Sequence, residues 1–126
     1  MATIKNIPTS LDDERLYKTS FHETTIHNSL AQICGALGIP VPEYFDDDKV
    51  HFECHIEMDG IFFTIYDWKE SDLVDKDTIL DYHIGTATPE ESDIVAKTLK
   101  EEYGLNTHTR KQREAELNKF FKRLGL

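Results

Sequence analysis

The sequence predicts an α+β fold with an N-terminal helix, a small antiparallel β-meander, and two C-terminal helices packed on one face of the sheet. Three observations lead to this prediction. An apolar stripe at helical spacing precedes residue 40, an Asp59-Gly60 pair joins two alternating segments, and two amphipathic segments follow residue 88. The chain has 126 residues, of which 39% are hydrophobic and 30% charged, which fits a single domain over residues 1–126 with one core.

Composition narrows the class of protein further. No apolar segment approaches the ~18–20 residues that cross a bilayer, and the opening MATIKNIPTS lacks the apolar stretch of a signal peptide. The two cysteines, Cys34 and Cys54, are too few for a disulfide framework or a cysteine-based zinc site, and both lie in apolar patterns. We therefore expect a soluble cytoplasmic protein with two buried thiols.

Two helices are predicted before residue 40. Ser10 and Asp13 form a capping pair that predicts a short helix over residues 11–17. A second helix is indicated by apolar residues spaced three and four positions apart, which share one helical face. These residues are Ile26, Leu30, Ile33, Cys34 and Leu37. Gly38 ends this helix, and the segment VPEYFDDDK that follows is typical of a loop.

Residues 50–68 give the clearest local signal. Asp59-Gly60 suits a type I′ turn, in which both central residues take positive φ, and a two-residue turn fixes the register of the hairpin. One face then carries the apolar residues Phe52, Cys54, Ile56, Met58, Ile61, Phe63 and Ile65. The opposite face, called the outer face below, pairs His51 with Trp68, Glu53 with Tyr66, His55 with Thr64 and Glu57 with Phe62.

The remaining elements follow from periodicity and caps. A third strand is expected over Ile79–Gly85, with Leu80, Tyr82 and Ile84 on one side and Asp81 and His83 on the other. Thr88 and Pro89 begin a helix over residues 89–103, which Gly104 ends. Its predicted buried stripe is Ile94, Val95, Thr98, Leu99 and Tyr103. A last helix at about residues 108–124 carries Leu117, Phe120, Phe121 and Leu124 on one face.

Charge is distributed unevenly along the chain. The net charge is −10, but residues 107–126 hold six basic and two acidic side chains, which leaves −14 on residues 1–106. An acidic body repels a phosphate backbone, so sequence-general binding of DNA or RNA is not expected. The basic segment either docks on the acidic body of its own chain or of a neighbouring subunit, or it grips a small anion.

The outer face and the basic segment are the candidate ligand-binding elements. Aromatic rings beside His and Glu suit stacking of a base and hydrogen bonds to ribose hydroxyls. Arg110 and Arg113, three residues apart on one helical face, suit a phosphate or carboxylate. The predicted ligand-binding residues are Tyr66, Trp68, Tyr82, His83, His51, Arg110 and Arg113. The alternatives are that the outer face packs on the last helix or on another subunit, and that the arginines form salt bridges with the acidic body.

Metal binding and catalysis have weaker signals. His51 and His55 lie about 13 Å apart along one strand face, which is too far for one ion. Asp46, Asp47 and Asp48 lack the alternate spacing of a calcium loop. The sequence has no phosphate-binding glycine loop and no nucleophile elbow, although acid–base work by His55 with Glu53 or Glu57 stays open. We expect no metal, no cofactor and no catalytic residue.

Two strings carry a family resemblance. TIYDWKE at residues 64–70 and Tyr82-His83-Ile84-Gly85 together resemble small tailed-phage proteins in which a TIYDWKE strand precedes a WHIG strand and a helix. The resemblance covers about residues 30–105, and it departs at Tyr82, where Trp is usual, and at Gly85-Thr86, where paired glycines are usual. It implies a phage or prophage origin and the cytoplasm of a bacterial host. Size and layout also resemble phage anti-Thoeris proteins, which oligomerise and sequester cyclic ADP-ribose signals.

The leading hypothesis is therefore a phage accessory protein that binds and sequesters a nucleotide-derived immune signal without turning it over. We expect a homo-oligomer with no membrane partner. One alternative is an acidic inhibitor that binds a host enzyme, and another is a phosphodiesterase that cleaves the signal through His55 or His83.

Overall fold

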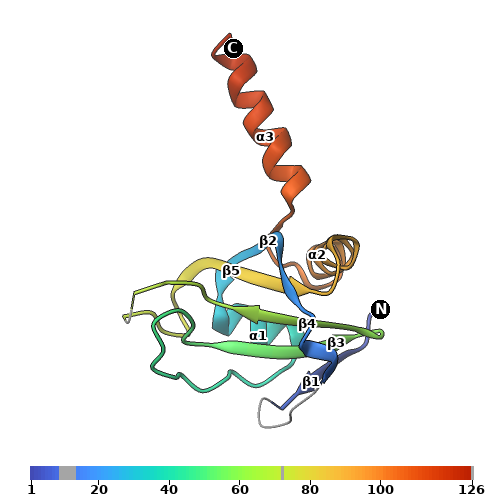
Figure 1. Cartoon of the computed structure of the whole chain (residues 1–126), viewed down its shortest axis with the longest axis vertical. Coiled ribbons are helices and arrows are strands. Elements are labelled where there is room, and N and C mark those ends of the chain that lie inside the picture. Colours follow the sequence, from blue (N-terminus) through green and yellow to red (C-terminus); the bar gives the residue numbers. More distant parts are fainter. Residues whose placement is uncertain (9–13, 72, 126) are drawn as a thin grey trace.

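The computed structural model describes residues 1–8, 14–71 and 73–125, which form an antiparallel sheet with three α-helices (Figure 1). The strands are β1 (Ile4–Ile7), β2 (Ser20–Ser29), β3 (Glu53–Met58), β4 (Ile61–Tyr66), β5 (Ile79–Thr86) and β6 (Thr107–His108), in the sheet order β1-β3-β4-β5-β2-β6. The helices are α1 (Leu30–Leu37), α2 (Pro89–Tyr103) and α3 (Arg110–Arg123). The α+β class is thus confirmed. No helix among the described residues has the length and apolar character needed to span a membrane.

The predicted meander lies at the centre of this sheet. β3 pairs with β4 in the predicted register, from Glu53 with Tyr66 at one end to Met58 with Ile61 at the other. Asp59 and Gly60 have φ values of 49° and 87°, as the predicted turn requires. β5 then pairs antiparallel with β4, so the three strands are neighbours in space as in sequence.

The N-terminal third differs from the prediction, because a ten-residue strand replaces the first part of the expected helix. β2 runs through Ile26 and lies between β5 and β6. Its β-branched residues Thr24, Thr25 and Ile26 favour an extended backbone, and all three are buried. α1 starts only after Ser29, whose side chain forms a capping box with Gln32.

The helix predicted over residues 11–17 is also not matched. Residues 9–13 lie outside the described residues, and Glu14–Leu16 form a single 3₁₀ turn. Ahead of it, β1 adds an edge strand beside β3, so the described chain begins with a strand rather than a helix.

The buried apolar side chains form one cluster to which the sheet, α1 and α2 all contribute. α2 has the predicted bounds, and Val95 and Leu99 are buried, but Ile94 is half exposed while Ala96 is buried in the core-facing stripe. Cys34 and Cys54 are buried free thiols, as predicted. The Cys54 thiol donates a hydrogen bond to Cys34, and this hydrogen bond together with burial raises the pKa of the Cys54 thiol, which keeps it protonated.

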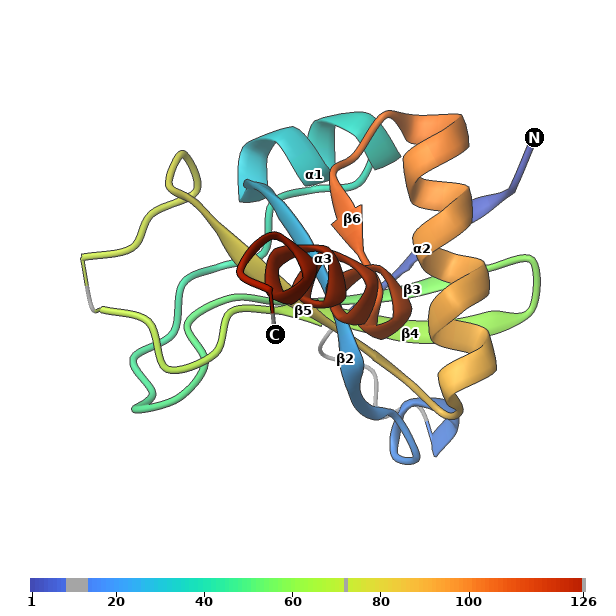
Figure 2. The same ribbon diagram turned by 90° about the horizontal axis from the view of Figure 1, so that it is seen from above.

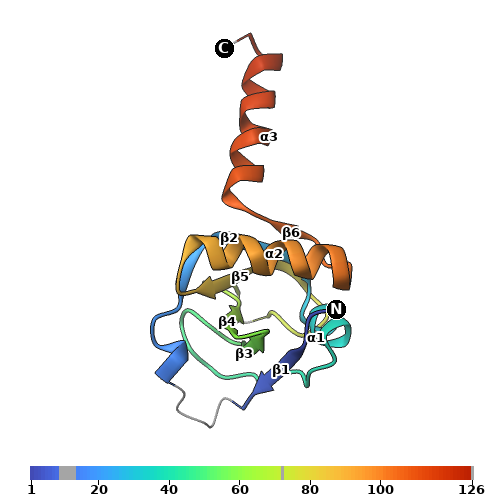
Figure 3. The same ribbon diagram turned by 90° about the vertical axis from the view of Figure 1, so that its right-hand side faces the viewer.

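α3 does not pack on the sheet, contrary to the prediction. Figures 1 and 3 show it projecting away from the rest of the chain, and none of its described residues is buried. Thr109 caps its first turn in a capping box with Gln112. The apolar side chains predicted to pack, Leu117, Phe120, Phe121 and Leu124, are instead between 39% and 57% exposed.

A buried contact between His51 and Asp67 closes the hairpin beyond its last ladder pair. The Asp67 carboxylate accepts hydrogen bonds from the backbone N–H groups of His51 and Phe52 and from His51 Nδ1, each at 2.8 Å. Both side chains are fully buried. His51 was predicted on the outer face opposite Trp68, and this prediction is wrong. The ladder ends at Glu53 and Tyr66, and His51 turns inward toward the carboxylate.

We predict that Asp67→Ala destabilises the protein by about 3–5 kcal/mol, because two buried N–H groups and a buried ring nitrogen lose their acceptor together. Asp67→Asn retains one carbonyl acceptor and should cost less. Equilibrium denaturation in urea measures both values. Asp75→Ala is the control, since its carboxylate also accepts backbone hydrogen bonds but is exposed. An Asp67→Ala loss no larger than that of Asp75→Ala would contradict this account of the contact.

Candidate ligand-binding site

Four rings lie together on the outer face of the sheet, and we call them the aromatic cluster: Phe21, Tyr66, Trp68 and His83. Tyr66 at the end of β4 pairs with His83 on β5, which pairs in turn with Thr25 on β2. Side chains of paired residues share one face, so this row crosses three strands. His83 is its centre, since Phe21 stacks on it with centroids 3.9 Å apart and Tyr66 meets it edge-on at 5.5 Å.

The rings of Trp68 and His83 face one another. Their planes are 24° from parallel and their centroids are 6.3 Å apart, while Tyr66 stands nearly perpendicular to Trp68, at 80°. Trp68 is 40% exposed and follows β4 immediately after the buried Asp67. The contact of Asp67 with His51 therefore fixes the backbone from which the Trp68 side chain emerges.

Two local features of the backbone bring Phe21 over His83. The register of β2 against β5 shifts between Phe21 and Thr25, and Glu23 within this bulge takes a φ of 63°. Phe21 pairs with Gly85, where a Cβ atom would lie 2.6 Å from Thr64 Oγ1. Gly85 thus lets the outer-face side chains close up around it, which gives a physical role to the glycine after His83-Ile84.

Cations flank the cluster on two sides. The Arg113 guanidinium, on the first turns of α3, donates a hydrogen bond of 2.6 Å to Thr25 Oγ1, beside His83. Its described hydrogen-bond partner is a hydroxyl rather than a carboxylate, so this contact leaves its charge uncompensated. On the other side, Lys69 Nζ lies 5.6 Å from the centroid of a Trp68 ring. A ligand over Trp68 and His83 would meet positive charge at both edges.

The two arginines predicted to act together have different surroundings. Arg110 Nε lies 3.2 Å from a Glu23 carboxylate oxygen and 3.1 Å from one of Glu114. For Arg110 the structure therefore shows the salt-bridge alternative, whereas Arg113 reaches the aromatic cluster. All three side chains of the Arg110 ion pairs are more than half exposed, so these pairs contribute little to stability.

Tyr82 and His51 do not belong to the cluster. Tyr82 is fully buried on the side of β5 that carries Leu80 and Ile84, and burial raises the pKa of its phenol. Its hydroxyl has no hydrogen-bond partner among the described residues. Both residues face the core, so neither can contact a ligand on the outer face without a rearrangement of the core. Of the predicted site residues, the structure brings together Tyr66, Trp68, His83 and Arg113, with Arg110 nearby.

Sequence reasoning missed Phe21, Thr25 and Lys69. Phe21 and Thr25 lie on β2, which the helix prediction obscured, although the β-branched run Thr24-Thr25-Ile26 could have indicated a strand. The position of Lys69 over Trp68 could not be predicted from the sequence. It depends on a backbone φ of 55° at Lys69, which residues other than glycine seldom adopt.

A His55–Glu53 pair lies beside the cluster on β3. His55 Nε2 is 2.8 Å from Glu53 Oε2, and Glu53 pairs across the ladder with Tyr66. Burial and the Glu53 charge raise the pKa of the Tyr66 phenol, so the phenol stays protonated and able to donate a hydrogen bond. The second ring nitrogen of His55, Nδ1, is buried with no described hydrogen-bond partner. A buried nitrogen cannot exchange a proton with a ligand on the surface, which disfavours this pair as a general base.

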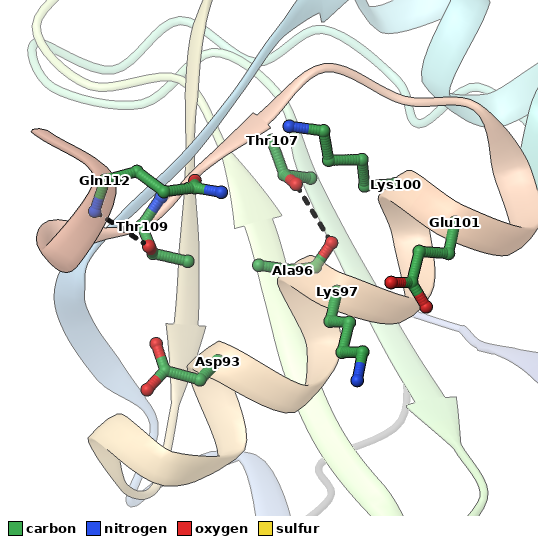
Figure 4. A pocket seen from close by; sticks show the side chains of 8 residues that line it. All are labelled: Asp93, Ala96, Lys97, Lys100, Glu101, Thr107, Thr109 and Gln112. Atoms are coloured by element: carbon green, nitrogen blue, oxygen red, sulfur yellow. Dashed lines mark hydrogen bonds between the residues drawn. The ribbon is translucent and has the colours of Figure 1, made fainter. Parts of the chain in front are cut away.

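Two pockets adjoin the base of α3. One, of about 250 Å³, is lined by Phe21, His22, Glu23, Pro89, Asp93, Arg110 and Lys111. Phe21 lines this pocket and also stacks on His83, so the pocket adjoins the aromatic cluster at Phe21. The other, of about 270 Å³, lies between α2 and the start of α3 and has side chains of both charges around it (Figure 4). In Figure 4, hydrogen bonds from Thr107 to Ala96 and from Gln112 to Thr109 fix its walls.

Among the described residues, no group of three or more His, Cys, Asp or Glu side chains is arranged to hold a metal ion. Comparison of the chain with protein-family models, with curated proteins and with solved structures finds no match. The functional interpretation of the structure therefore rests on the aromatic cluster and its flanking cations.

His83 is the titratable group at the centre of the site. Burial and the Arg113 charge lower its pKa from the ordinary value of 6.5, so the ring is neutral at pH 7. A lowered folded-state pKa means that the unfolded chain binds this proton more tightly. The contribution of His83 to the free energy of unfolding is therefore complete above the ordinary pKa of 6.5, and it is lost as the pH falls through the lowered pKa of the folded state.

We predict that Arg113→Gln raises the pKa of His83 toward 6.5, because the substitution removes the nearby positive charge but leaves the ring half-buried. A pH titration of the His83 ring followed by NMR measures the shift. Lys119→Gln removes the same charge further along α3 and should leave the His83 pKa unchanged. An equal shift in both variants would show that Arg113 does not lie beside His83 in solution.

Proposed function

We propose that this protein is a non-catalytic binding protein that holds a planar, anionic ligand of the nucleotide class on the outer face of its sheet. The observation that carries the proposal is the pair of near-parallel rings, Trp68 and His83, with Arg113 beside them. Stacking on aromatic rings and a guanidinium for phosphate are the two contacts that nucleotide sites combine.

The ring geometry supports stacking of a base. An aromatic ring held between two others needs about 7 Å, or twice the ~3.5 Å contact distance of carbon atoms. The centroids of Trp68 and His83 are 6.3 Å apart, and the exposed Trp68 side chain has room to rotate outward. Tyr66, edge-on to both rings, would form the floor of such a site and present a protonated hydroxyl.

The charge distribution supports a small anion over a polymer. Arg113 and Lys69 place two cations at the cluster, and the pocket beside Phe21 adds Lys111, whereas Arg110 in that pocket is paired with Glu23 and Glu114. The body that surrounds them carries −14 over residues 1–106. Such a body repels a long phosphate backbone but leaves room for a few phosphate groups at the local cations.

Binding without turnover is the version of this function that the site favours. His83 is stacked under Phe21, and the free nitrogen of His55 is buried. Neither ring combines a carboxylate partner on one nitrogen with an exposed second nitrogen, the arrangement by which a carboxylate orients a histidine general base. The resemblance in size and layout to phage anti-Thoeris proteins suggests a role in sequestering a nucleotide-derived immune signal in an infected cell.

We predict that Trp68→Ala abolishes nucleotide binding while leaving the fold intact, because Trp68 lies on the outer face and not in the core. Calorimetric titration with a panel of linear and cyclic mono- and dinucleotides measures the affinity. Tyr17→Ala, which removes an exposed ring outside the cluster, is the matched control. Ligand recovered after denaturation should be chemically unchanged. Altered ligand would instead support a phosphodiesterase, and no binding from the panel would support the acidic inhibitor.

A second prediction concerns Arg113 and thermal stability. A nucleotide that binds only the folded state should raise the melting temperature, since it stabilises by ~2.7 kcal/mol at a hundredfold excess over Kd. Arg110→Ala with Arg113→Ala should remove most of this rise. Without nucleotide the double variant should unfold close to the wild-type temperature, because the ion pairs of Arg110 are exposed. A large loss of stability in the ligand-free variant would show that the arginines serve the fold.

A further inference from the structure

α3 presents an apolar face that nothing in the described part of its own chain covers. Leu117, Phe120, Phe121 and Leu124 follow one another at spacings of three, one and three residues, which places them on one helical face, and each is at least 39% exposed. Phe120 and Phe121 contact one another with centroids 6.0 Å apart. Contiguous exposed apolar side chains with a charged rim are typical of a protein–protein contact.

The charge of α3 argues against pairing with an identical helix. Residues 107–126 carry six basic and two acidic side chains, and Lys119, Lys122 and Arg123 surround the apolar face. Two such helices side by side would bring like charges together. The same charge favours an acidic acceptor, and residues 1–106 of this chain carry −14.

One end of the body combines acidic and exposed apolar side chains, and we call it the acidic end. It consists of residues 41–50, between α1 and β3, and residues 69–71 and 73–78, between β4 and β5. A hydrogen bond from the Lys69 N–H to the Lys49 carbonyl joins the two segments, which lie together in Figures 1 and 2. Tyr44 and Phe45 are more than 40% exposed, and Leu73 is 91% exposed. Asp46, Asp47 and Asp48 follow Phe45 directly.

The acidic end keeps its charge over a wide range of pH. Asp47 accepts hydrogen bonds from the N–H groups of Lys49 and Val50, which lower the pKa of its carboxyl group. Asp75 accepts them from the Asp77 N–H and the Thr78 hydroxyl, with the same effect on its pKa. The acidic end is therefore the counterpart of α3 in both properties, because it offers apolar contacts surrounded by carboxylates.

We propose that α3 of one copy of this chain docks on the acidic end of a second copy, so that the protein is a homo-oligomer. The contact places Phe120 and Phe121 against Phe45 and Leu73, with Lys122 and Arg123 facing Asp46 and Asp48. α3 points away from the body of its own chain, so the acceptor belongs to another copy (Figures 1 and 3). In a two-fold dimer the contact forms twice, and in a ring it forms once between each pair of neighbours.

Light scattering of the full chain tests this assembly with two variants and their controls. The helix variant is Phe120→Gln with Phe121→Gln, and its control is Tyr17→Gln with Ile94→Gln, which are exposed residues outside both α3 and the acidic end. The acceptor variant is Asp46→Lys with Asp48→Lys, and its control is Glu14→Lys with Glu101→Lys, which changes the net charge equally at exposed sites. Circular dichroism confirms that each variant is folded.

We expect the wild type and both controls to be oligomers and both variants to be monomers. Mixing the helix variant with the acceptor variant should restore an assembly of two chains, since one supplies an intact acidic end and the other an intact α3. A monomeric wild type would overturn the proposal. So would an acceptor variant that assembles like the wild type, or a mixture that stays monomeric. Trp68 is unchanged throughout, so these outcomes are independent of nucleotide binding.

Discussion

The buried carboxylate of Asp67 is the constraint on which the rest of the outer face depends. It accepts three hydrogen bonds from His51 and Phe52 at the point where the β3–β4 ladder stops. One long segment enters β3 here and another leaves β4, and without this acceptor the N–H groups of His51 and Phe52 would be buried and unpaired. Because Asp67 points inward, its neighbours Tyr66 and Trp68 are directed to the opposite side. One buried contact therefore sets both the end of the hairpin and the geometry of the aromatic cluster.

Local rules predicted the parts of the fold that depend on neighbours in sequence. The hairpin register follows from a turn, and the bounds of α2 follow from its caps. The strand predicted over Ile79–Gly85 follows from alternation, and β5 extends one residue further, to Thr86. β2 was missed because Ile26 is at helical spacing from Leu30 by coincidence, and only its pairing with both β5 and β6 makes it a strand. The orientation of α3 was missed because an amphipathic pattern shows that one face of a helix is apolar. It does not show which surface that face contacts.

In the candidate site, too, local patterns predicted some residues, and long-range contacts determine the others. Tyr66, Trp68 and His83 could be placed on neighbouring strands by alternation alone. Their convergence also needs Phe21, which reaches His83 through a bulge with a positive φ at Glu23, and Gly85, which makes room for Thr64. Neither depends on a local pattern. His51 was misplaced because alternation was extended past the last ladder pair, where hydrogen bonding to Asp67 rather than pleating decides the direction of the side chain.

α3 takes part in both the nucleotide site and the contact between copies that we propose. Its first turns bring Arg113 to the aromatic cluster, and its last turns present the apolar face. Positive charge at the start of a helix opposes the helix dipole, so Arg110, Lys111 and Arg113 are not placed there for the stability of α3 alone. The cations at the far end, Lys122 and Arg123, agree with the dipole. Among the described residues, the side-chain contacts that hold the base of α3 to the body are Arg113–Thr25 and Arg110–Glu23, which do little to fix the direction of the helix. Docking on a second copy would fix that direction and, with it, the position of Arg113 beside His83. Assembly would then order the cation beside the stacking rings before a ligand arrives, which lowers the entropic cost of binding.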